Sequence, residues 1–278
     1  MMAVQPRLFH PWQILLVLAM GLLGLMGCAD TASNERVNSL TRADPNEQRN
    51  KAARRLALAS AYFEQGQNDV AQQEVRAALL IDANYAEAYS LLGLIHQRDK
   101  AIDLAEQSFE QALKLALALP SRPKELAAVQ HNYAWFLCEQ NRLDQAQTQF
   151  ARALSQPGYT EAAKTWMALG VCQLRAGKPL DARNSWVHAL THDPQNPVAQ
   201  YQLAALDFQD GNPRRAQSYL GSLNDSRNAT AQSLWLGIRL AHALVQNDEL
   251  QRLSEQLLKK FPDSEQAHLL LQRNFDQP

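Results

Sequence analysis

Few side chains in this 278-residue chain are spaced so that they could do chemistry. It contains no glycine-rich nucleotide loop, no Gly-x-Ser-x-Gly elbow and no His-Glu-x-x-His pair. His188 and His192 have the spacing of two metal ligands, but zinc sites need three or four ligands and this pair has no third ligand or acid motif beside it. We therefore interpret the pair as a solvated helix end stabilised by the helix dipole. The sequence predicts no enzyme, no metal and no cofactor.

Cys28 follows a short apolar segment that has the features of a secretory signal peptide. Arg7 is the only charged residue before a charge-free run from Ile14 to Met26. At 1.5 Å per residue that run spans roughly 20 Å as a helix, well short of the ~30 Å hydrocarbon core of a bilayer. A basic start, a short apolar stretch and small residues at its end instead predict a cleaved signal over residues 1–27.

Leu25-Met26-Gly27-Cys28 resembles the lipobox of bacterial lipoproteins, although Met is less usual in its place. The Cys28 sulfur would take a diacylglyceryl group by thioether formation, and several acyl chains anchor a protein stably. The alternative is that Cys28 is an ordinary residue of the apolar run. In the sorted lipoproteins that this segment resembles, an Asp directly after the Cys retains the protein in the inner membrane. Ala29 stands there in this chain, which predicts the outer membrane.

The composition argues against nucleic acid as a partner and leaves the pairing of two cysteines open. Lys and Arg number 27 against 28 Asp and Glu, a net charge of -1, so there is no basic signal for nucleic acid. If Cys28 is lipidated, Cys138 and Cys172 are too few for a disulfide-built fold. Two small buried thiols are favoured over a bridge, because free Cys is among the most buried residue types, but the bridge stays possible.

Residues 28–50 read as a flexible tether between the modified Cys and a folded domain over residues 51–278. The tether lacks periodic apolar residues. At its end, Asp44-Pro45-Asn46-Glu47 supplies an N-cap, a Pro for the first helical position and an acid three residues after the cap. We therefore expect the first helix to begin here.

Small and aromatic residues recur with a period close to 34 residues in the folded domain. The fourth copy is the clearest, with Trp166, Leu169, Gly170, Gly177, Ala182, Trp186, Ala189, Leu190 and Pro194. This pattern resembles the tetratricopeptide repeat, in which small residues let the two helices of a repeat, and the next repeat, approach closely. The sequence predicts an all-α tetratricopeptide-repeat solenoid of about six repeats, starting near residues 52, 86, 127, 163, 197 and 230. The long second step reflects an insertion around "LPSRPKELA", which predicts a loop with a possible function.

A repeat solenoid offers a concave groove lined by the first helix of each repeat. The second, fifth, ninth and twelfth places of those helices form one stripe, which is apolar and aromatic where a solvated surface would be mostly charged. It comprises Ala53, Leu56, Ser60, Phe63, Glu87, Ser90, Leu94, Gln97, Ala128, His131, Trp135 and Cys138, with Met167, Val171, Leu174, Tyr201 and Phe208 in later repeats. The stripe predicts a groove for an apolar segment or amphipathic helix of another protein, unless superhelical packing or a terminal helix buries it. Asn132 and Lys164 stand largely alone, which disfavours a clamp for a C-terminal carboxylate.

Two local sequences carry a resemblance to one family of such repeat proteins. "HNYAWFLCEQNRLDQA", residues 131–146, resembles the third repeat of the type IV pilus biogenesis and stability lipoproteins, the PilF/PilW family of secretin pilotins, with Ala134 in place of a Gly. "LWLGIRLA", residues 234–241, resembles the sixth repeat of the same family. The generic repeat demands neither motif, and the resemblance extends from Cys28 to about Pro262.

The resemblance implies a binding role at the periplasmic face of the outer membrane. A lipid anchor would carry the protein there, and its groove would hold secretin subunits so that they localise and multimerise. Under this hypothesis an apolar secretin segment occupies the groove of the first three repeats, without nucleic acid or a small-molecule substrate. The predicted contact residues are Leu56, Ser60, Phe63, Leu94 and Trp135. The alternative is a lipoprotein scaffold that recruits cell-wall synthesis or hydrolysis enzymes.

Overall fold

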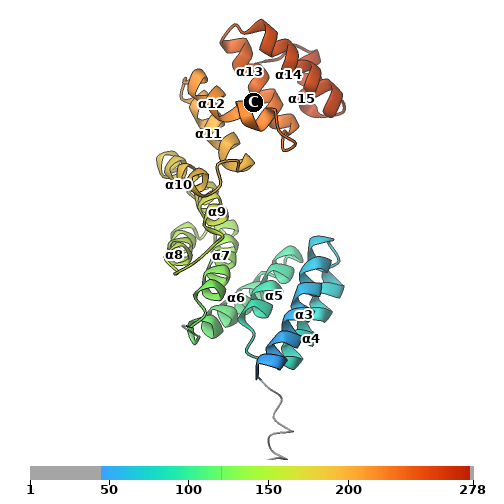
Figure 1. Cartoon of the computed structure of the whole chain (residues 1–278), viewed down its shortest axis with the longest axis vertical. Coiled ribbons are helices and arrows are strands. Elements are labelled where there is room, and N and C mark those ends of the chain that lie inside the picture. Colours follow the sequence, from blue (N-terminus) through green and yellow to red (C-terminus); the bar gives the residue numbers. More distant parts are fainter. Residues whose placement is uncertain (1–44, 120, 276–278) are drawn as a thin grey trace, which may run out of the picture. The chain divides into compact units, whose positions relative to one another are not determined.

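The computed structural model describes residues 45–119 and 121–275, and this part of the chain folds into helices with no strand (Figure 1). None of the described helices combines the length and the apolar character that crossing a bilayer requires. The predicted signal, the tether up to residue 44 and Cys28 lie outside the described residues. The chain divides after Lys51, and the packing below is that of the unit that begins at Ala52.

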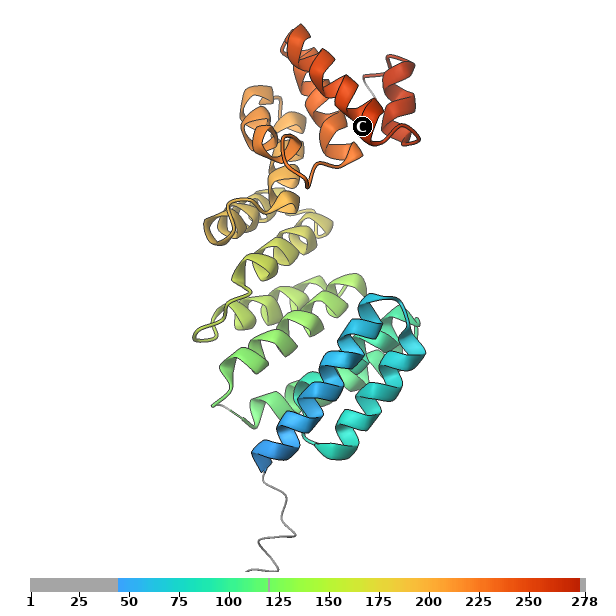
Figure 2. The ribbon, with the colours of Figure 1, turned by 45° about the vertical axis from the view of Figure 1, so that its right-hand side comes forward.

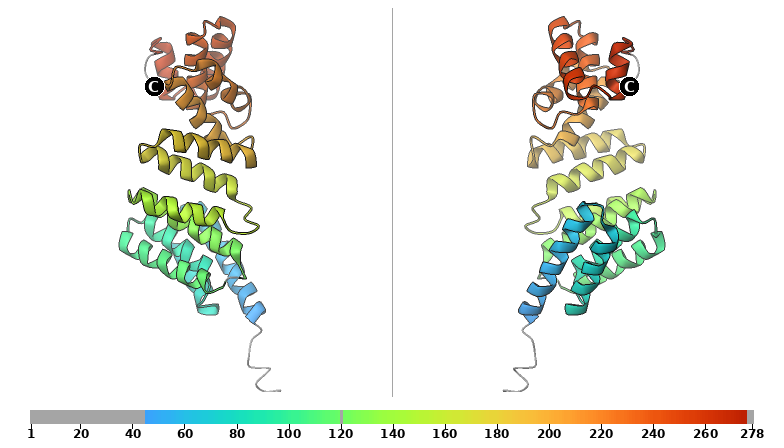
Figure 3. Two further views of the ribbon diagram at one scale, coloured as in Figure 1. Left: turned by 90° about the vertical axis from the view of Figure 1, so that its left-hand side faces the viewer. Right: turned by 90° about the vertical axis from the view of Figure 1, so that its right-hand side faces the viewer.

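The described helices follow one another in pairs with short connections, and one helix is added at the end. They are α3 (Pro45–Glu64), α4 (Asn68–Ile81), α5 (Ala86–Arg98), α6 (Ile102–Leu117), α7 (Pro123–Glu139), α8 (Leu143–Leu154), α9 (Ala162–Arg175), α10 (Pro179–His192), α11 (Pro197–Gln209), α12 (Pro213–Asn224), α13 (Ala231–Ala243), α14 (Asn247–Lys260) and α15 (Glu265–Leu271). From α5 to α14 the two helices of each pair pack against each other, and each pair packs against the next (Figures 2 and 3). The predicted all-α repeat fold is confirmed.

Helix starts agree with the predicted repeats at residues 86 and 197 and differ elsewhere by a few positions. The difference at α7 concerns the insertion "LPSRPKELA", because Pro123 is the first residue of this helix and not part of a loop. The added residues lengthen α6 to 16 and α7 to 17 residues. Helix α3 is described from Pro45 onward, so the expected end of the tether at residue 50 lies inside this helix. The predicted N-cap, Asp44, lies outside the described residues.

The turn between the two helices of each pair contains one residue with a left-handed backbone, at φ between 57° and 77°. In three pairs this residue is Gly66, Gly177 or Gly211, which adopts such a conformation without steric penalty. In the sixth pair it is Val245, a β-branched residue for which this φ is unfavourable. The recurrence of one turn geometry explains why glycine recurs at this place of the repeat.

Small residues in the first helix of a repeat allow close contact with an aromatic side chain from the second. A Cβ added at Gly93 would lie 2.9 Å from the Phe109 ring, and one added at Gly170 would overlap the Trp186 indole. Phe109 and Trp186 are fully buried, and the Trp186 Nε1 donates to the Met167 carbonyl oxygen at 3.2 Å. The small-residue spacing found in the sequence therefore reflects contacts between paired helices.

Gly170→Ala should destabilise the protein by about 1–3 kcal/mol, because the added methyl forces the Trp186 indole to move within a close-packed core. Gly221→Ala is the matched control, since nothing lies within 4 Å of the Cβ it adds inside α12. Alanine is a better helix former than glycine, so this control should be neutral or up to about 1 kcal/mol more stable. Urea unfolding followed by circular dichroism compares the two; equal midpoints would contradict the packing explanation.

A buried carboxylate joins three helices at the junction of the fourth and fifth pairs. The Asp207 side chain in α11 is fully buried. Arg183 Nη1 of α10 donates to its Oδ1 at 2.7 Å, and Arg215 Nε of α12 donates to its Oδ2 at 2.8 Å. Arg183 also pairs with Asp210 through Nη2 at 2.9 Å. Burial is tolerated here because the carboxylate is paired and hydrogen-bonded from both sides.

Candidate functional site

An apolar groove lies across the first three repeats, and it is called the N-terminal groove below. It encloses about 380 Å³, within the range of ligand pockets. Its lining comes from α3, α5 and α7 with one residue before α5: Ala53, Leu56, Ala57, Ser60, Tyr85, Glu87, Ser90, Leu91, Leu94, Ala128, Val129 and Asn132. Seven of the twelve stripe residues predicted in these repeats therefore line one hollow surface.

Three of the five predicted contact residues line the N-terminal groove. Leu56 and Ser60 come from α3, and Leu94 comes from α5. Phe63 and Trp135 lie outside this lining. The Arg98 guanidinium lies over the Phe63 ring at 3.5 Å, and the Arg175 guanidinium lies 5.6 Å from the Trp135 ring. Their role in binding stays a prediction, now for two half-buried rings that each contact an arginine.

Polar groups in the N-terminal groove are few and mostly bonded to neighbours. The Ser60 hydroxyl donates to the Leu56 carbonyl oxygen at 3.0 Å, and Asn132 Nδ2 donates to the Ser90 hydroxyl at 3.0 Å. Glu87 is the one charged side chain among the described residues of this lining. An apolar surface with a few fixed polar groups suits an apolar protein segment better than a charged one.

His131 was predicted to face the groove, but the structure buries it against the next repeat. Only 6% of its surface is exposed, and its Nδ1 lies 2.8 Å from the Thr165 hydroxyl of α9. The same hydroxyl lies 2.8 Å from the Tyr159 hydroxyl. Burial, helped by the charge of Lys164, lowers the pKa of His131 to about 4. This imidazole therefore stays neutral at neutral pH and joins two repeats.

Acidification should lower the free energy of unfolding through His131, because the pKa of this side chain is about 4 in the folded protein and near 6.5 when it is exposed. Between pH 4 and 6.5 the unfolded chain binds a proton at His131 more readily than the folded protein does. The contribution of the neutral imidazole to the free energy of unfolding is therefore complete above pH 6.5 and falls as the pH drops toward 4. At pH 4.5 the loss should be about 2–3 kcal/mol. His131→Gln should reduce the difference between urea midpoints at pH 7.5 and 4.5. His188→Gln, an exposed control, should preserve it, and equal pH dependence in both variants would exclude His131.

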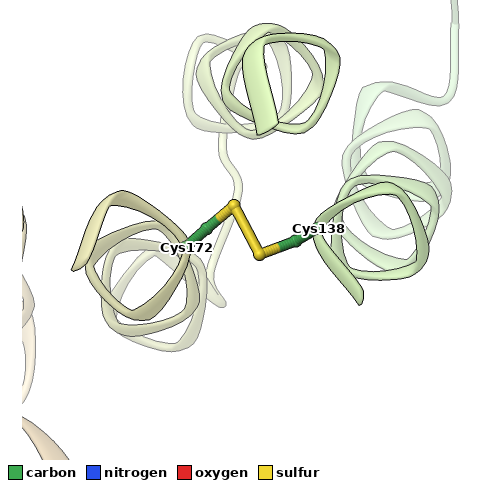
Figure 4. The surroundings of a disulfide bond; sticks show 2 residues. All are labelled: Cys138 and Cys172. Carbon is green, nitrogen blue, oxygen red and sulfur yellow. A yellow bond between two sulfur atoms is a disulfide. The ribbon is translucent and has the colours of Figure 1, made fainter. Parts of the chain in front are cut away.

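Cys138, the last residue of the predicted stripe in the third repeat, is bonded to Cys172 (Figure 4). The two Cα atoms are 5.8 Å apart, a usual separation for a disulfide. The bond joins α7 to α9, and its cysteines are 34 residues apart, one repeat length. Both residues are fully buried. The preference for two free thiols is therefore wrong, and Cys138 cannot line an open groove.

A second hollow surface, called the C-terminal groove below, lies on the fifth and sixth repeats. It consists of two adjoining pockets of about 360 and 400 Å³ that share Tyr201 and Gln232. Their lining residues are Pro197, Val198, Tyr201, Ala205, Phe208, Gln209, Leu223, Asn228, Thr230, Gln232, Ser233, Trp235, Leu236, Arg239 and Gln266. The predicted stripe included Tyr201 and Phe208 but missed the contribution of α13.

The α13 residues of the groove were missed because the sixth repeat was predicted to start near residue 230, one residue before this helix begins. Counting from Ala231, the first residue of α13, the stripe falls on Gln232, Trp235 and Arg239. Thr230 is the N-cap, because its side chain accepts a hydrogen bond from the Ser233 backbone while the Ser233 hydroxyl accepts one from the Thr230 backbone. The Thr-x-x-Ser spacing was the available signal for the correct start.

The described residues hold no group of three or more His, Cys, Asp or Glu side chains arranged to bind a metal ion. His188 stacks on Trp166 with ring centroids 4.6 Å apart, and His192 ends α10. The pair is therefore part of an exposed helix end, and the features with functional potential are the two grooves.

Two models of the tetratricopeptide-repeat family match the chain, over residues 84–157 and 137–197. Together they cover the second to fourth helix pairs, including the disulfide. These matches agree with the paired helices and with the glycine–aromatic contacts described above.

Similar proteins cover most of the chain. The type IV pilus assembly protein PilF of Pseudomonas aeruginosa is 28% identical over 242 residues, which are 87% of this chain and 91% of that protein. The solved structure of Pseudomonas aeruginosa PilF superposes with a TM-score of 0.69 and 26% identity, covering 82% of this chain and 98% of that one. PilW, described as a widely conserved type IV pilus biogenesis factor, gives a TM-score of 0.67 and 27% identity, covering 82% of this chain and 100% of that one.

Proposed function

This chain belongs to the tetratricopeptide-repeat family of type IV pilus biogenesis proteins, and we propose that its N-terminal groove binds a subunit of the pilus secretin. The protein acts by binding and not by catalysis, and it promotes the localisation and multimerisation of the secretin in the outer membrane. The proposal joins the pilus role of the relatives to a groove whose chemistry suits an apolar protein segment. A secretin is proposed because it must assemble at the membrane to which Cys28 would attach this protein.

The shape and chemistry of the N-terminal groove support the proposal most directly. Leu56 and Leu91 form a largely buried apolar floor, and the half-buried Leu94 adds apolar surface beside them. Ser90 and Asn132 hold each other in a fixed orientation at the same surface. An amphipathic helix or extended segment would bury its apolar side chains here, the mode of recognition used by many helix-in-groove complexes.

Charge placed inside the N-terminal groove tests the binding site. The double variant Ala57→Glu with Leu94→Glu should reduce secretin capture in a detergent pull-down by about tenfold or more, because two carboxylates at the groove surface would lose hydration on contact with an apolar segment. Leu80→Glu is the matched control, since Leu80 is 89% exposed on α4 and outside the groove. Circular dichroism confirms that each variant is folded. Undiminished capture by the folded double variant would refute this site.

The proposed anchor requires a separate experiment. Cys28→Ser should release the protein from the outer-membrane fraction and reduce the secretin multimers that are found there on a gel. The expectation rests on the lipobox-like residues before Cys28, which lie outside the described part of the chain. Normal multimers in the outer membrane of this variant would contradict the anchoring mechanism. Capture of cell-wall enzymes in place of a secretin by the unaltered protein would favour the alternative scaffold.

A further inference from the structure

The stripe of the sixth repeat is covered by a segment from near the end of the chain. Counted from the start of α13, the fifth, ninth and twelfth places are Trp235, Arg239 and His242. In the first repeat the fifth and ninth places are Leu56 and Ser60, which line the N-terminal groove. The sixth repeat therefore has a stripe at the same places, and its occupant shows what such a stripe can hold.

Phe275 contacts all three residues of this stripe. Its ring stacks on the Trp235 ring, with centroids 6.0 Å apart, and on the His242 ring, with centroids 4.4 Å apart. Its carbonyl oxygen accepts a hydrogen bond from Arg239 Nε at 2.9 Å. An aromatic side chain in the site and a backbone oxygen held by an arginine are contacts that a bound protein segment would make.

The turn that ends α15 brings Phe275 to the stripe. Arg273 has a left-handed backbone at φ 54°, and the Asn274 backbone N–H donates to the Leu269 carbonyl oxygen at 3.0 Å. This is a Schellman motif, in which glycine is the favoured residue at the left-handed position. Because arginine is less favourable there, the contacts of Phe275 with α13 help to hold the chain in this conformation.

The segment after α15 lies at the surface, whereas α15 itself is fixed in the core. Ala267 and Leu269 of α15 are buried in the cluster that also contains Trp235. Gln272 and Arg273 are exposed, and Phe275 is half-buried. Phe275 can therefore leave the stripe while α15 stays in place.

The covered stripe continues the C-terminal groove along α13. Trp235 and Arg239 line the pocket of about 400 Å³ together with Phe208 of α11, and the same two residues contact Phe275. The Arg239 guanidinium also lies 5.0 Å from the Phe208 ring. Departure of Phe275 would therefore lengthen this groove as far as His242.

We propose that the stripe of the sixth repeat is a second docking site that the chain's own Phe275 closes, and that a partner segment with an aromatic side chain opens it by displacing Phe275. The observed contacts define the chemistry of the partner segment. Its ring would lie against Trp235 and His242, and the carbonyl oxygen of the same residue would accept from Arg239. Because Phe275 is on the same chain, its effective concentration is high and excludes weak ligands. The inference is independent of the proposed capture of a secretin, which concerns the N-terminal groove.

A labelled peptide, QRNFDQP, repeats residues 272–278 and tests the site in the full chain. The Phe275→Ala variant should bind it about tenfold more tightly than the unaltered protein does, because no ring of the chain then competes for the stripe. Fluorescence anisotropy with protein purified in detergent measures both affinities. The same peptide with Ala in place of Phe should bind neither protein.

Control variants locate the bound peptide. Leu271→Ala alters a side chain that is 68% exposed at the end of α15, and this variant should bind the peptide as weakly as the unaltered protein. His242→Ala, added to Phe275→Ala, should weaken binding by roughly two- to tenfold because one stacking partner is lost. Ala57→Glu with Leu94→Glu, added to Phe275→Ala, should leave peptide binding unchanged. If binding is lost there, the peptide lies in the N-terminal groove and the inference is wrong.

Three further results would overturn the proposal. If Phe275→Ala lowers the urea midpoint but gains no peptide binding, Phe275 serves only to cover the end of the core. If the unaltered protein and Phe275→Ala bind the peptide equally, the chain's own segment does not close the stripe. If sedimentation shows the unaltered protein as a dimer that Phe275→Ala dissociates, the segment occupies the stripe of a second copy.

Discussion

Replacing Asp207 by Asn should lower the free energy of unfolding by about 3 kcal/mol or more. The substitution keeps the shape of the side chain but removes the anion between Arg183 and Arg215. Burial raises the pKa of the Asp207 carboxyl, but the hydrogen bonds from Arg215 and Arg183 lower it by more, so the pKa lies below its usual value. The folded protein therefore holds the charged carboxylate. Arg183 is only 16% exposed and would lose one of its two acidic partners.

Asp210→Asn is the matched control for this prediction. Asp210 also pairs with Arg183, but its side chain is 57% exposed, and an ion pair at such a site contributes about 0–1 kcal/mol. Because stability in repeat proteins depends on contacts between neighbours, the loss in Asp207→Asn should be concentrated at α10, α11 and α12. Hydrogen exchange measures this directly, and equal protection of these helices in the two variants would contradict a structural role for Asp207.

The stabilisation that Asp207 provides should decrease as the pH falls. A carboxyl whose pKa is lowered by folding stabilises the protein above the pKa of the unfolded chain, and the contribution is lost as the pH falls through the folded value. The unaltered protein should therefore lose part of its advantage over Asp207→Asn in strong acid. His131 loses its contribution at less acidic pH, so His131→Gln serves as the background in which both forms are compared.

Reducing the Cys138–Cys172 disulfide should destabilise the protein by about 3–4 kcal/mol. The bond closes a loop with a sequence separation of 34 residues, and this length sets the entropy that the crosslink removes from the unfolded chain. Urea unfolding with and without a reductant measures the effect. The double variant Cys138→Ala with Cys172→Ala is the control and should show no response to the reductant.

The same disulfide predicts a thiol count. In the denatured but unreduced protein, Cys138 and Cys172 should not react with a thiol reagent, and two thiols should appear after reduction. Reduction should also loosen the contact between α7 and α9, because the bond lies within the interface of these helices (Figure 4). Two reactive thiols in the oxidised protein would exclude the bond.

Contacts within one repeat could be predicted well from the sequence. Gly170 predicted close approach of paired helices, and the structure places Trp186 against it. Phe109 lies against Gly93 in the same way. These contacts could be predicted because helical spacing acts over a few residues or between adjacent helices.

Contacts between repeats were predicted less well. His131 and Cys138 belong to the stripe by spacing, but they turn toward α9 and are buried there. Their neighbours Leu94 and Ser60 stay at a groove surface. Small and apolar residues serve equally well in a groove or between repeats, so residue type alone could not separate these two environments.

The amino-acid sequence established the period of the repeat, the all-α fold and the family, because these depend on residue types at short, regular spacings. The side chains left open for binding were established by packing between repeats. His131–Thr165 and Cys138–Cys172 join residues 34 positions apart, and Asp207 joins α10 to α12. These pairings depend on how each helix pair is rotated against the next, and that rotation places the apolar stripe in two separate grooves.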